Sequence, residues 1–259
     1  MTLPLDGVTI VVTRPAAQAS RFLELARATG AACIPYPTLQ IDRIALGDAT
    51  RAQLRSRTWD WAIFTSANAV ESALEQCPTP LAARHAAVGR ATARTLEQHG
   101  IKVDACPESA SSEGLLELPE FAALADHGVL LVKGSGGREL LRDALRARGA
   151  DVLELDVYRR SVTAPTAAAA AQLQDALTST APLVVVVTSV EVLRSLLENV
   201  AEDDQARLRS RMLLVPGPRV AAASVRFGWT GPVVTAATAE DETMLAALRG
   251  LAAGSRPPA

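Results

Sequence analysis

The chain has 259 residues, 49% of them hydrophobic, and is therefore long enough to form one large domain or two small ones around buried cores. Its 26 Lys and Arg against 28 Asp and Glu give a formal net charge of −2, which argues against a general nucleic-acid binder. The three cysteines lie far apart and the three histidines lack ligand spacing, so neither a disulfide framework nor a metal site is expected.

No targeting or membrane segment is expected either. The first residues lack the basic flank and apolar stretch of a secretory signal. The strongest apolar run, at residues 183–187, is far shorter than the roughly 20 residues that a membrane helix needs. We therefore expect a cytoplasmic protein that does not interact with a membrane.

The first predicted unit is a strand, a helix and a second strand. Residues 7–13 form an apolar run typical of a buried strand, and residues 31–36 predict the second strand. Gly30 stands between the helix and that strand, at the place where a left-handed residue ends a helix. The same unit recurs at residues 128–158, so the chain contains an internal repeat.

A second unit begins with a short apolar run followed by Thr-Ser, at residues 61–66 and again at residues 184–189. Each copy continues with an amphipathic helix, another strand and another helix. A glycine turn, at Gly100 or Gly228, then leads to a predicted third strand. Strands that alternate with helices of roughly 10–15 residues indicate βαβ units and a parallel sheet.

The two units alternate along the chain, and two partitions into domains are compatible with that order. A tandem duplication would divide the chain near residue 125. Alternatively, the two middle units form one domain, and the two outer units form the other. Residues 161–171 then predict a return linker that runs into a helix. Either partition gives two similar α/β halves, with the cleft between them as the expected ligand site.

The loop after the strand at residues 128–133 is the strongest candidate for an anion-binding site. It contains Lys133, Gly134, Gly136, Gly137 and Arg138. Glycines at a strand-to-helix junction let backbone N–H groups point at an anion, and the two cations would add charge. The spacing matches neither a P-loop nor GxGxxG. The alternative is a tight turn with two solvated cations.

The two Thr-Ser loops are predicted helix starts. Asn68 and Thr188 each precede a Glu by three residues, which is the spacing of a capping box. Capping alone would explain these residues. In the functional interpretation, Ser66 and Ser189 also offer hydroxyls to a ligand oxygen.

Three further places carry candidate residues. Arg14 follows the first strand and is more often a surface charge than a ligand contact. Arg90 and Thr92 open a glycine-led helix, where the threonine either caps or binds. Tyr158 ends a strand, where a phenol either packs in a hinge or donates a proton.

The order of these motifs and the two-fold repeat resemble the uroporphyrinogen-III synthase family over residues 5–250. The residues that carry the resemblance are 11–15, 64–66, 88–93, 134–141, 156–158 and 187–189. The resemblance implies closure of hydroxymethylbilane in haem biosynthesis, without a metal or organic cofactor. The hydroxymethyl group leaves as water, a spiro intermediate forms, and the terminal ring is inverted.

The resemblance also implies the fold. It predicts two similar Rossmann- or flavodoxin-like parallel-sheet α/β domains joined by a two-strand hinge. The first would contain residues 1–40 and 162–259, and the second residues 41–161. The expected partner is a small polycarboxylate substrate, bound by a monomer. A cleft lined by N–H donors, hydroxyls and arginines suits that substrate because local potential decides binding, whatever the net charge.

The resemblance implies roles for Tyr158, Ser66, Thr92 and Ser189, and the chemistry of the loops adds the other candidates. Tyr158 is the expected catalytic proton donor. The expected substrate-binding residues are Arg14, Ser66, Arg90, Thr92, Lys133, Gly134, Gly136, Gly137, Arg138, Ser189 and Arg219. Arg219 stands where the family often keeps a threonine, and Val190 replaces part of a common Pro-Ser-Gly.

Two other functions remain as alternatives. The first is a non-catalytic, hinge-closing binder of an anionic small molecule, which would not require Tyr158. The second, a Rossmann-type oxidoreductase, is disfavoured by the missing dinucleotide fingerprint.

Overall fold

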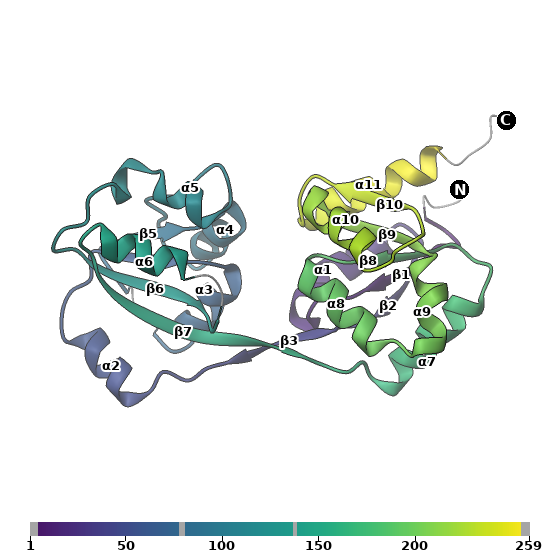
Figure 1. Ribbon diagram of the computed structural model, residues 1–259, viewed down its shortest axis with the longest axis horizontal. Coiled ribbons are helices and arrows are strands. Elements are labelled where there is room, and N and C mark those ends of the chain that lie inside the picture. Colours follow the sequence, from purple (N-terminus) through teal and green to yellow (C-terminus); the bar gives the residue numbers. More distant parts are fainter. Residues whose placement is uncertain (1–4, 78–80, 137–138, 255–259) are drawn as a thin grey trace. The chain divides into compact units, whose positions relative to one another are not determined.

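The structure is a computed structural model and describes residues 5–77, 81–136 and 139–254. The chain folds into two compact units (Figure 1). The first unit combines Met1–Gln40 with Ser161–Ala259, and the second is Ile41–Arg160. Each unit contains one five-stranded sheet with helices packed on both faces.

The sheet of the first unit is parallel, with the order β10-β9-β8-β1-β2. Its strands are β1 (Thr9–Val12), β2 (Ala32–Pro35), β8 (Leu183–Val186), β9 (Met212–Pro216) and β10 (Val233–Ala236). This is the doubly wound order 2-1-3-4-5, in which the winding direction reverses between β1 and β8. Ligands of such sheets bind beyond the carboxyl ends of the strands on either side of that reversal.

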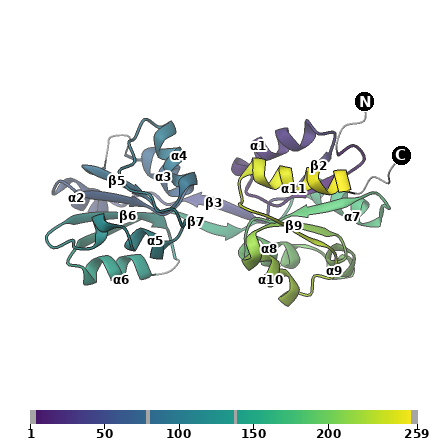
Figure 2. The same ribbon diagram turned by 90° about the horizontal axis from the view of Figure 1, so that it is seen from above.

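Helices cover both faces of this sheet, which explains the unbroken apolar runs in the sequence. The helices are α1 (Ala16–Arg27), α7 (Ala167–Thr178), α8 (Val190–Asn199), α9 (Glu202–Arg209), α10 (Gly217–Arg226) and α11 (Asp241–Gly254). Figure 2 shows α1 and α11 on one side of the sheet and α8, α9 and α10 on the other. Ile10 and Val12 pack towards the first side, and Val11 packs towards the second.

The second unit has a similar sheet with the order β3-β7-β6-β4-β5, in which β7, β6, β4 and β5 are parallel and β3 pairs antiparallel with β7. Its strands are β3 (Leu39–Arg43), β4 (Trp61–Phe64), β5 (Arg84–Ala87), β6 (Gly128–Gly134) and β7 (Asp151–Val162). Its helices are α2 (Asp48–Arg55), α3 (Ala67–Leu74), α4 (Arg90–Gln98), α5 (Ser112–Leu116), the short 3₁₀ helix η1 (Pro119–Phe121) and α6 (Leu140–Ala147). Leu130 and Val132 pack on the side of α3 and α4, whereas Val129 and Leu131 pack on the side of α5 and α6 (Figure 2).

The repeated strand-helix-strand units are confirmed. The helices α1 and α6 are each followed by a glycine with a left-handed backbone, Gly30 at φ +89° and Gly149 at φ +91°. That conformation reverses the chain into β2 or β7, as the sequence pattern predicts.

The predicted third strand after Gly100 does not form. Its place holds an isolated parallel bridge between Ala86 and Ala105, whereas the strand after Gly228 forms as β10. In a parallel ladder, the next bond beyond Ala105 would need the N–H of residue 107. That residue is Pro107, which has no N–H to donate.

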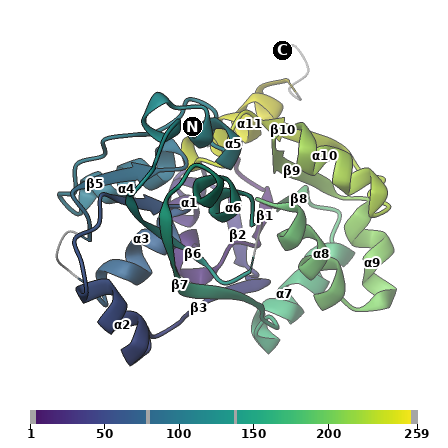
Figure 3. The same ribbon diagram turned by 60° about the vertical axis from the view of Figure 1, so that its left-hand side comes forward.

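Strands β3 and β7 both cross the boundary between the two units. They lie side by side in Figures 1 and 3. The N–H of Ile44 donates to the carbonyl of Val157 at 2.9 Å, and the N–H of Thr163 donates to the carbonyl of Thr38 at 3.0 Å. β7 has 12 residues and ends at Val162, four residues beyond the predicted end, because this pairing extends it.

Among the described residues, no helix has the length and apolar character needed to cross a membrane. The same part of the chain contains no group of three or more His, Cys, Asp or Glu side chains that could hold a metal ion.

His85 on β5 links stability to pH. Its side chain is 7% exposed and its ring stacks on Phe64, with 6.5 Å between the ring centroids. Burial lowers the pKa of His85 below its ordinary value of 6.5, and the nearby Asp104 carboxylate opposes this only in part. The unfolded chain therefore binds the histidine proton more tightly than the folded chain does.

We expect the free energy of unfolding to fall as the pH drops from about 6.5 towards the lower folded pKa, because the unfolded state gains the proton first. The His85→Phe variant should lose this part of the pH dependence. Urea unfolding at pH values of about 7.5, 6.5 and 5.5, on either side of the ordinary histidine pKa, measures it for both proteins. Parallel curves for the two proteins would refute the assignment to His85.

Candidate functional site

The loops that carry the candidate residues of the second unit follow two adjacent strands. β4 and β6 are paired in parallel, so the residues after Phe64 and after Gly134 meet at one edge of the sheet. The hydroxyl of Thr65 ties these strand ends together by donating to the carbonyl of Val132 at 3.4 Å. In this repeat the winding also reverses between β6 and β4, so this edge is the ligand edge expected for the sheet.

Ser66 begins α3 as its N-cap. Its backbone is extended, and its Oγ accepts the N–H of Ala69 at 3.2 Å. The prediction that Asn68 is the N-cap is wrong, because the N-cap lies two residues earlier, at Ser66. Helix α3 already begins at Ala67, so Asn68 lies inside its first turn.

Ser189 has the equivalent position in the first unit. It caps α8, and its Oγ accepts the N–H of Val192 at 3.1 Å. The predicted cap at Thr188 is therefore wrong by one residue. Both serines are half-buried, and each lies at the carboxyl end of a central strand.

Tyr158 reaches the same edge from β7. Its side chain is 3% exposed, and its Oη lies 3.0 Å from the Oγ of Ser66. Arg160 donates from Nη2 to the same Oη at 3.3 Å, and its guanidinium carbon lies 5.8 Å from the centroid of the phenol ring. The phenol oxygen is thus held between a hydroxyl and a cation.

A β-bulge aims Tyr158 at Ser66. Lys133 pairs with Asp156 in the ladder, but the next residue, Gly134, pairs with Tyr158, which leaves Val157 as an extra residue in β7. Without the extra residue, strict alternation would place Tyr158 on the face opposite Val157. With it, both side chains pack into the core beneath α3 and α4.

Gly134 makes room for the phenol ring. A Cβ at this position would lie 2.6 Å from Cζ of Tyr158 and 2.9 Å from its Oη. Real Cβ atoms do not approach so closely, so only glycine lets β6 pass beside this ring. Gly134 therefore positions Tyr158 by packing against it.

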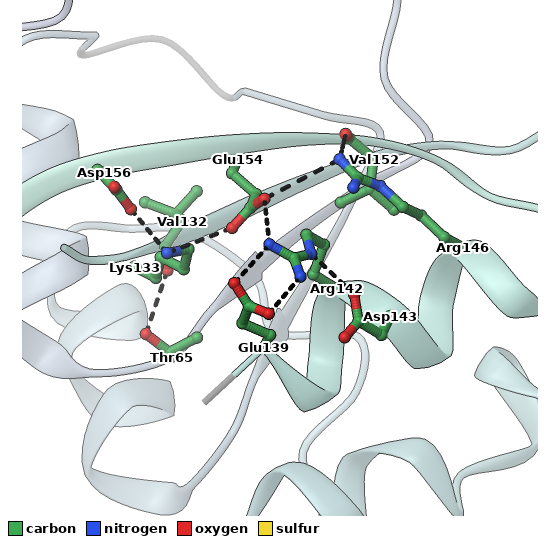
Figure 4. Close-up of polar contacts among 10 residues, drawn as sticks. All are labelled: Thr65, Val132, Lys133, Glu139, Arg142, Asp143, Arg146, Val152, Glu154 and Asp156. Atoms are coloured by element: carbon green, nitrogen blue, oxygen red, sulfur yellow. Dashed lines mark hydrogen bonds and ion pairs between the residues drawn. The ribbon is translucent and has the colours of Figure 1, made fainter. Parts of the chain in front are cut away.

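Lys133 is paired with two carboxylates of β7 (Figure 4). Its Nζ lies 2.9 Å from Asp156 and 3.3 Å from Glu154. Burial acts to lower the pKa of Lys133, but hydrogen bonds and charge attraction to these carboxylates outweigh it, so the pKa lies above its ordinary value. Arg142 of α6 extends the network, with 3.7 Å to Glu154 and 2.8 Å to Glu139. Lys133 thus joins β6 to β7 at the bulge.

An arginine that follows a strand is more often an exposed surface charge, but Arg14 is buried in this structure. Its side chain forms an ion pair with Asp241 at the start of α11 and donates to the carbonyl of Ala239 at 2.8 Å. Its guanidinium also stacks over Phe22, with 5.1 Å to the ring centroid. Removing one partner of a buried pair costs about 3–5 kcal/mol, so this arginine is fixed within the first unit.

The remaining candidates lie at helix starts. Arg90 is exposed in the first turn of α4 and lines a pocket of about 310 Å³ with Glu97 and Cys106, whereas Thr92 is 5% exposed. Arg219 is exposed in the first turn of α10.

In the glycine loop after β6, Gly136 has φ +77°, a left-handed conformation that favours glycine, and open space around it. Gly137 and Arg138 lie outside the described residues.

Comparison with known proteins identifies the family. The family described as "Uroporphyrinogen-III synthase HemD" matches residues 20–246. The chain belongs to this family. The uroporphyrinogen-III synthase of Salmonella typhimurium is 30% identical over 251 residues, which cover 93% of this chain and all of the relative. That of Synechococcus elongatus is 36% identical over 167 residues, or 60% of this chain and 61% of the relative.

A solved structure of a family member supports the fold. The crystal structure of a mutant uroporphyrinogen III synthase from the extremely thermophilic bacterium Thermus thermophilus has a TM-score of 0.61 and 22% identity, and the match covers 96% of this chain and all of the other. The family model and the relatives confirm the family resemblance, and the solved structure agrees with the α/β class with parallel-sheet segments.

In this member of the uroporphyrinogen-III synthase family, the structure brings together three of the predicted site residues. Ser66, Gly134 and Tyr158 are in contact at the carboxyl edge of the second unit, whereas the side chain of Lys133 pairs with Asp156 and Glu154. Arg14 and Ser189 belong to the first unit. The sequence interpretation missed Arg160. A usable signal was present, because residues two apart on a strand share a face.

Proposed function

We propose that the chain closes hydroxymethylbilane to uroporphyrinogen III, with loss of water and inversion of the terminal ring, and that Tyr158 is the proton donor. Membership of the family supports the reaction. The observation that supports the role of the tyrosine is its hydroxyl, held 3.0 Å from Ser66 at the ligand edge of the second sheet.

The proposed chemistry begins at the hydroxymethyl group. Tyr158 gives its proton to the hydroxyl oxygen, the C–O bond breaks with its electron pair going to oxygen, and water leaves. The resulting azafulvene is electrophilic, and the substituted carbon of the terminal ring attacks it to form the spiro intermediate. Fragmentation and reclosure invert the ring, and the proton lost on rearomatisation restores the phenol.

The enzyme must favour the spiro route, because unaided bilane closes without inversion. Holding the substrate in a curled conformation is a task of positioning and of preferential transition-state binding. We assign it to exposed or edge groups that can reach substrate carboxylates. These are Ser66, Arg90, Gly136, Ser189 and Arg219, with Gly137 and Arg138 as candidates from the sequence. Thr92 is 5% exposed, so we do not assign it a substrate contact.

Two predicted binding residues have a different role in this proposal. Lys133 and Arg14 already hold carboxylates of their own units, so a substrate carboxylate would have to displace Asp156 or Asp241. We propose that this lysine and this arginine support the fold around the site. Gly134 belongs with them, since it positions the phenol ring.

We further propose that the two compact units are the functional domains and that β3 and β7 form the hinge between them. The continuity of both strands through the unit boundaries supports this proposal.

The test supplies fresh hydroxymethylbilane to the purified chain and separates the porphyrin isomers after oxidation. We expect the type III isomer to dominate, against type I in a control without protein. Type I alone, at the rate of that control, would refute the synthase function. Saturable binding of the bilane without turnover would instead favour a non-catalytic binder.

A further inference from the structure

Among the described residues, two side chains form hydrogen bonds with the hydroxyl of Tyr158, and they differ in chemistry. The guanidinium of Arg160 can only donate, and it donates to Oη at 3.3 Å. Ser66, at 3.0 Å, can donate or accept. The way in which these two residues share the phenol oxygen therefore decides where the phenol proton points.

Counting donors and acceptors gives one arrangement suited to proton transfer. The Oγ of Ser66 accepts the N–H of Ala69, which leaves its own O–H free to donate to Tyr158. The phenol oxygen then accepts from Ser66 and from Arg160, so both of its acceptor positions are filled. In this arrangement neither of these two neighbours takes the phenol proton.

We infer that Arg160 is a positioning residue for the proton transfer, acting through Tyr158. This inference rests on the proposed function of Tyr158. When the phenol gives its proton to the departing hydroxyl, negative charge develops on Oη. The Arg160 guanidinium and the Ser66 hydroxyl already point at that oxygen, so they stabilise the charge without rearrangement.

The neighbouring arginine provides a matched control. Arg159 is also exposed and lies on β7, but it faces the other way and its Nε is 3.6 Å from the carboxylate of Asp42. Arg159 and Arg160 thus differ in their contact with Tyr158 while sharing charge, size and strand.

The experiment measures kcat, KM and the isomer ratio with hydroxymethylbilane for the full-length chain and its variants. We expect Arg160→Met to lower kcat about tenfold with KM changed less than about twofold, because an exposed cation is partly screened. Arg160→Lys should recover part of the loss, since it keeps the charge. Arg159→Met should stay within about twofold of the parent in both constants.

A double variant separates action through Tyr158 from an independent effect. Adding Arg160→Met to Tyr158→Phe should cause no further loss of kcat, because the oxygen on which Arg160 acts is gone. An equal loss in both backgrounds would overturn the inference. So would an Arg160→Met variant with unchanged kcat, or one that raises KM alone, which would make Arg160 a substrate-binding cation.

Failure of the proposed function gives a different result. If the parent chain forms no type III isomer, or if Tyr158→Phe keeps full kcat, the proposed function fails and this inference fails with it. If both of those results are as proposed and Arg160→Met behaves like Arg159→Met, only the inference about Arg160 fails.

Arg160→Gln serves as a second variant, and thermal unfolding confirms that each variant is folded.

Discussion

Replacing Tyr158 by Phe is expected to lower kcat about 100-fold while changing KM less than about threefold. The substitution keeps the ring that packs against Gly134 and removes only the Oη that contacts Ser66 and Arg160. The lost proton matters in the transition state, whereas substrate binding keeps its other contacts. Initial rates over a range of hydroxymethylbilane concentrations, with isomer analysis, measure both constants.

Tyr36 is the matched control because it is the other tyrosine of the chain. It is buried in the first unit, and its hydroxyl donates to the carbonyl of Asn199 at 3.3 Å. We expect Tyr36→Phe to cost roughly 0.5–1.5 kcal/mol of stability and to leave kcat unchanged. Equal losses of kcat in the two Phe variants, or none in either, would remove Tyr158 from the catalytic role.

Replacing Gly134 by Ala is expected to lower kcat about 10- to 100-fold, although Ala carries no chemistry of its own. The new Cβ would lie 2.6 Å from the ring of Tyr158, so the ring must move by most of an ångström. That movement breaks the alignment of Oη with Ser66. Overpacking should also destabilise the second unit by about 1–3 kcal/mol.

Gly47→Ala provides the control for this substitution. Gly47 precedes α2 in the same unit, has φ −68°, and a Cβ there would meet nothing within 4 Å. Gly47 is the N-cap of α2, where Gly is preferred to Ala, but Ala also lowers the entropy of the unfolded chain. We therefore expect a net change in stability of less than about 1 kcal/mol and no change in kcat. Activity and urea unfolding are measured for both variants. A Gly134→Ala variant with the kcat of the parent would show that ring position does not limit turnover.

Much of the fold is readable from local patterns. Short apolar runs, followed by helices and closing glycines such as Gly30 and Gly149, predict the repeated strand-helix-strand units, and the structure contains them. These signals work because each depends on neighbouring residues alone. The missing strand near Ala105 shows the limit, since Pro107 removes one ladder bond and the strand does not extend.

For the candidate site too, the sequence identifies some of the residues but not the contacts between them. The sequence points to Ser66 and Tyr158 separately, but it contains no sign that the extra residue Val157 would turn the phenol towards the serine. It also offers Lys133 as a free cation, whereas Asp156 and Glu154 of the next strand neutralise it. Both outcomes depend on how β6 pairs with β7, two strands that are separated in the sequence by the whole of α6.

By itself, the sequence determined the α/β class, the internal repeat and the residue types at the strand ends, because local periodicity and chain-reversing glycines encode these features. The tertiary structure alone decided which strand ends meet, where the bulge falls and which cations are already paired. These features depend on strand register and on ion pairs between residues that are far apart in the sequence. A shift of one residue in β7 would turn Tyr158 to the other face without changing its sequence neighbours.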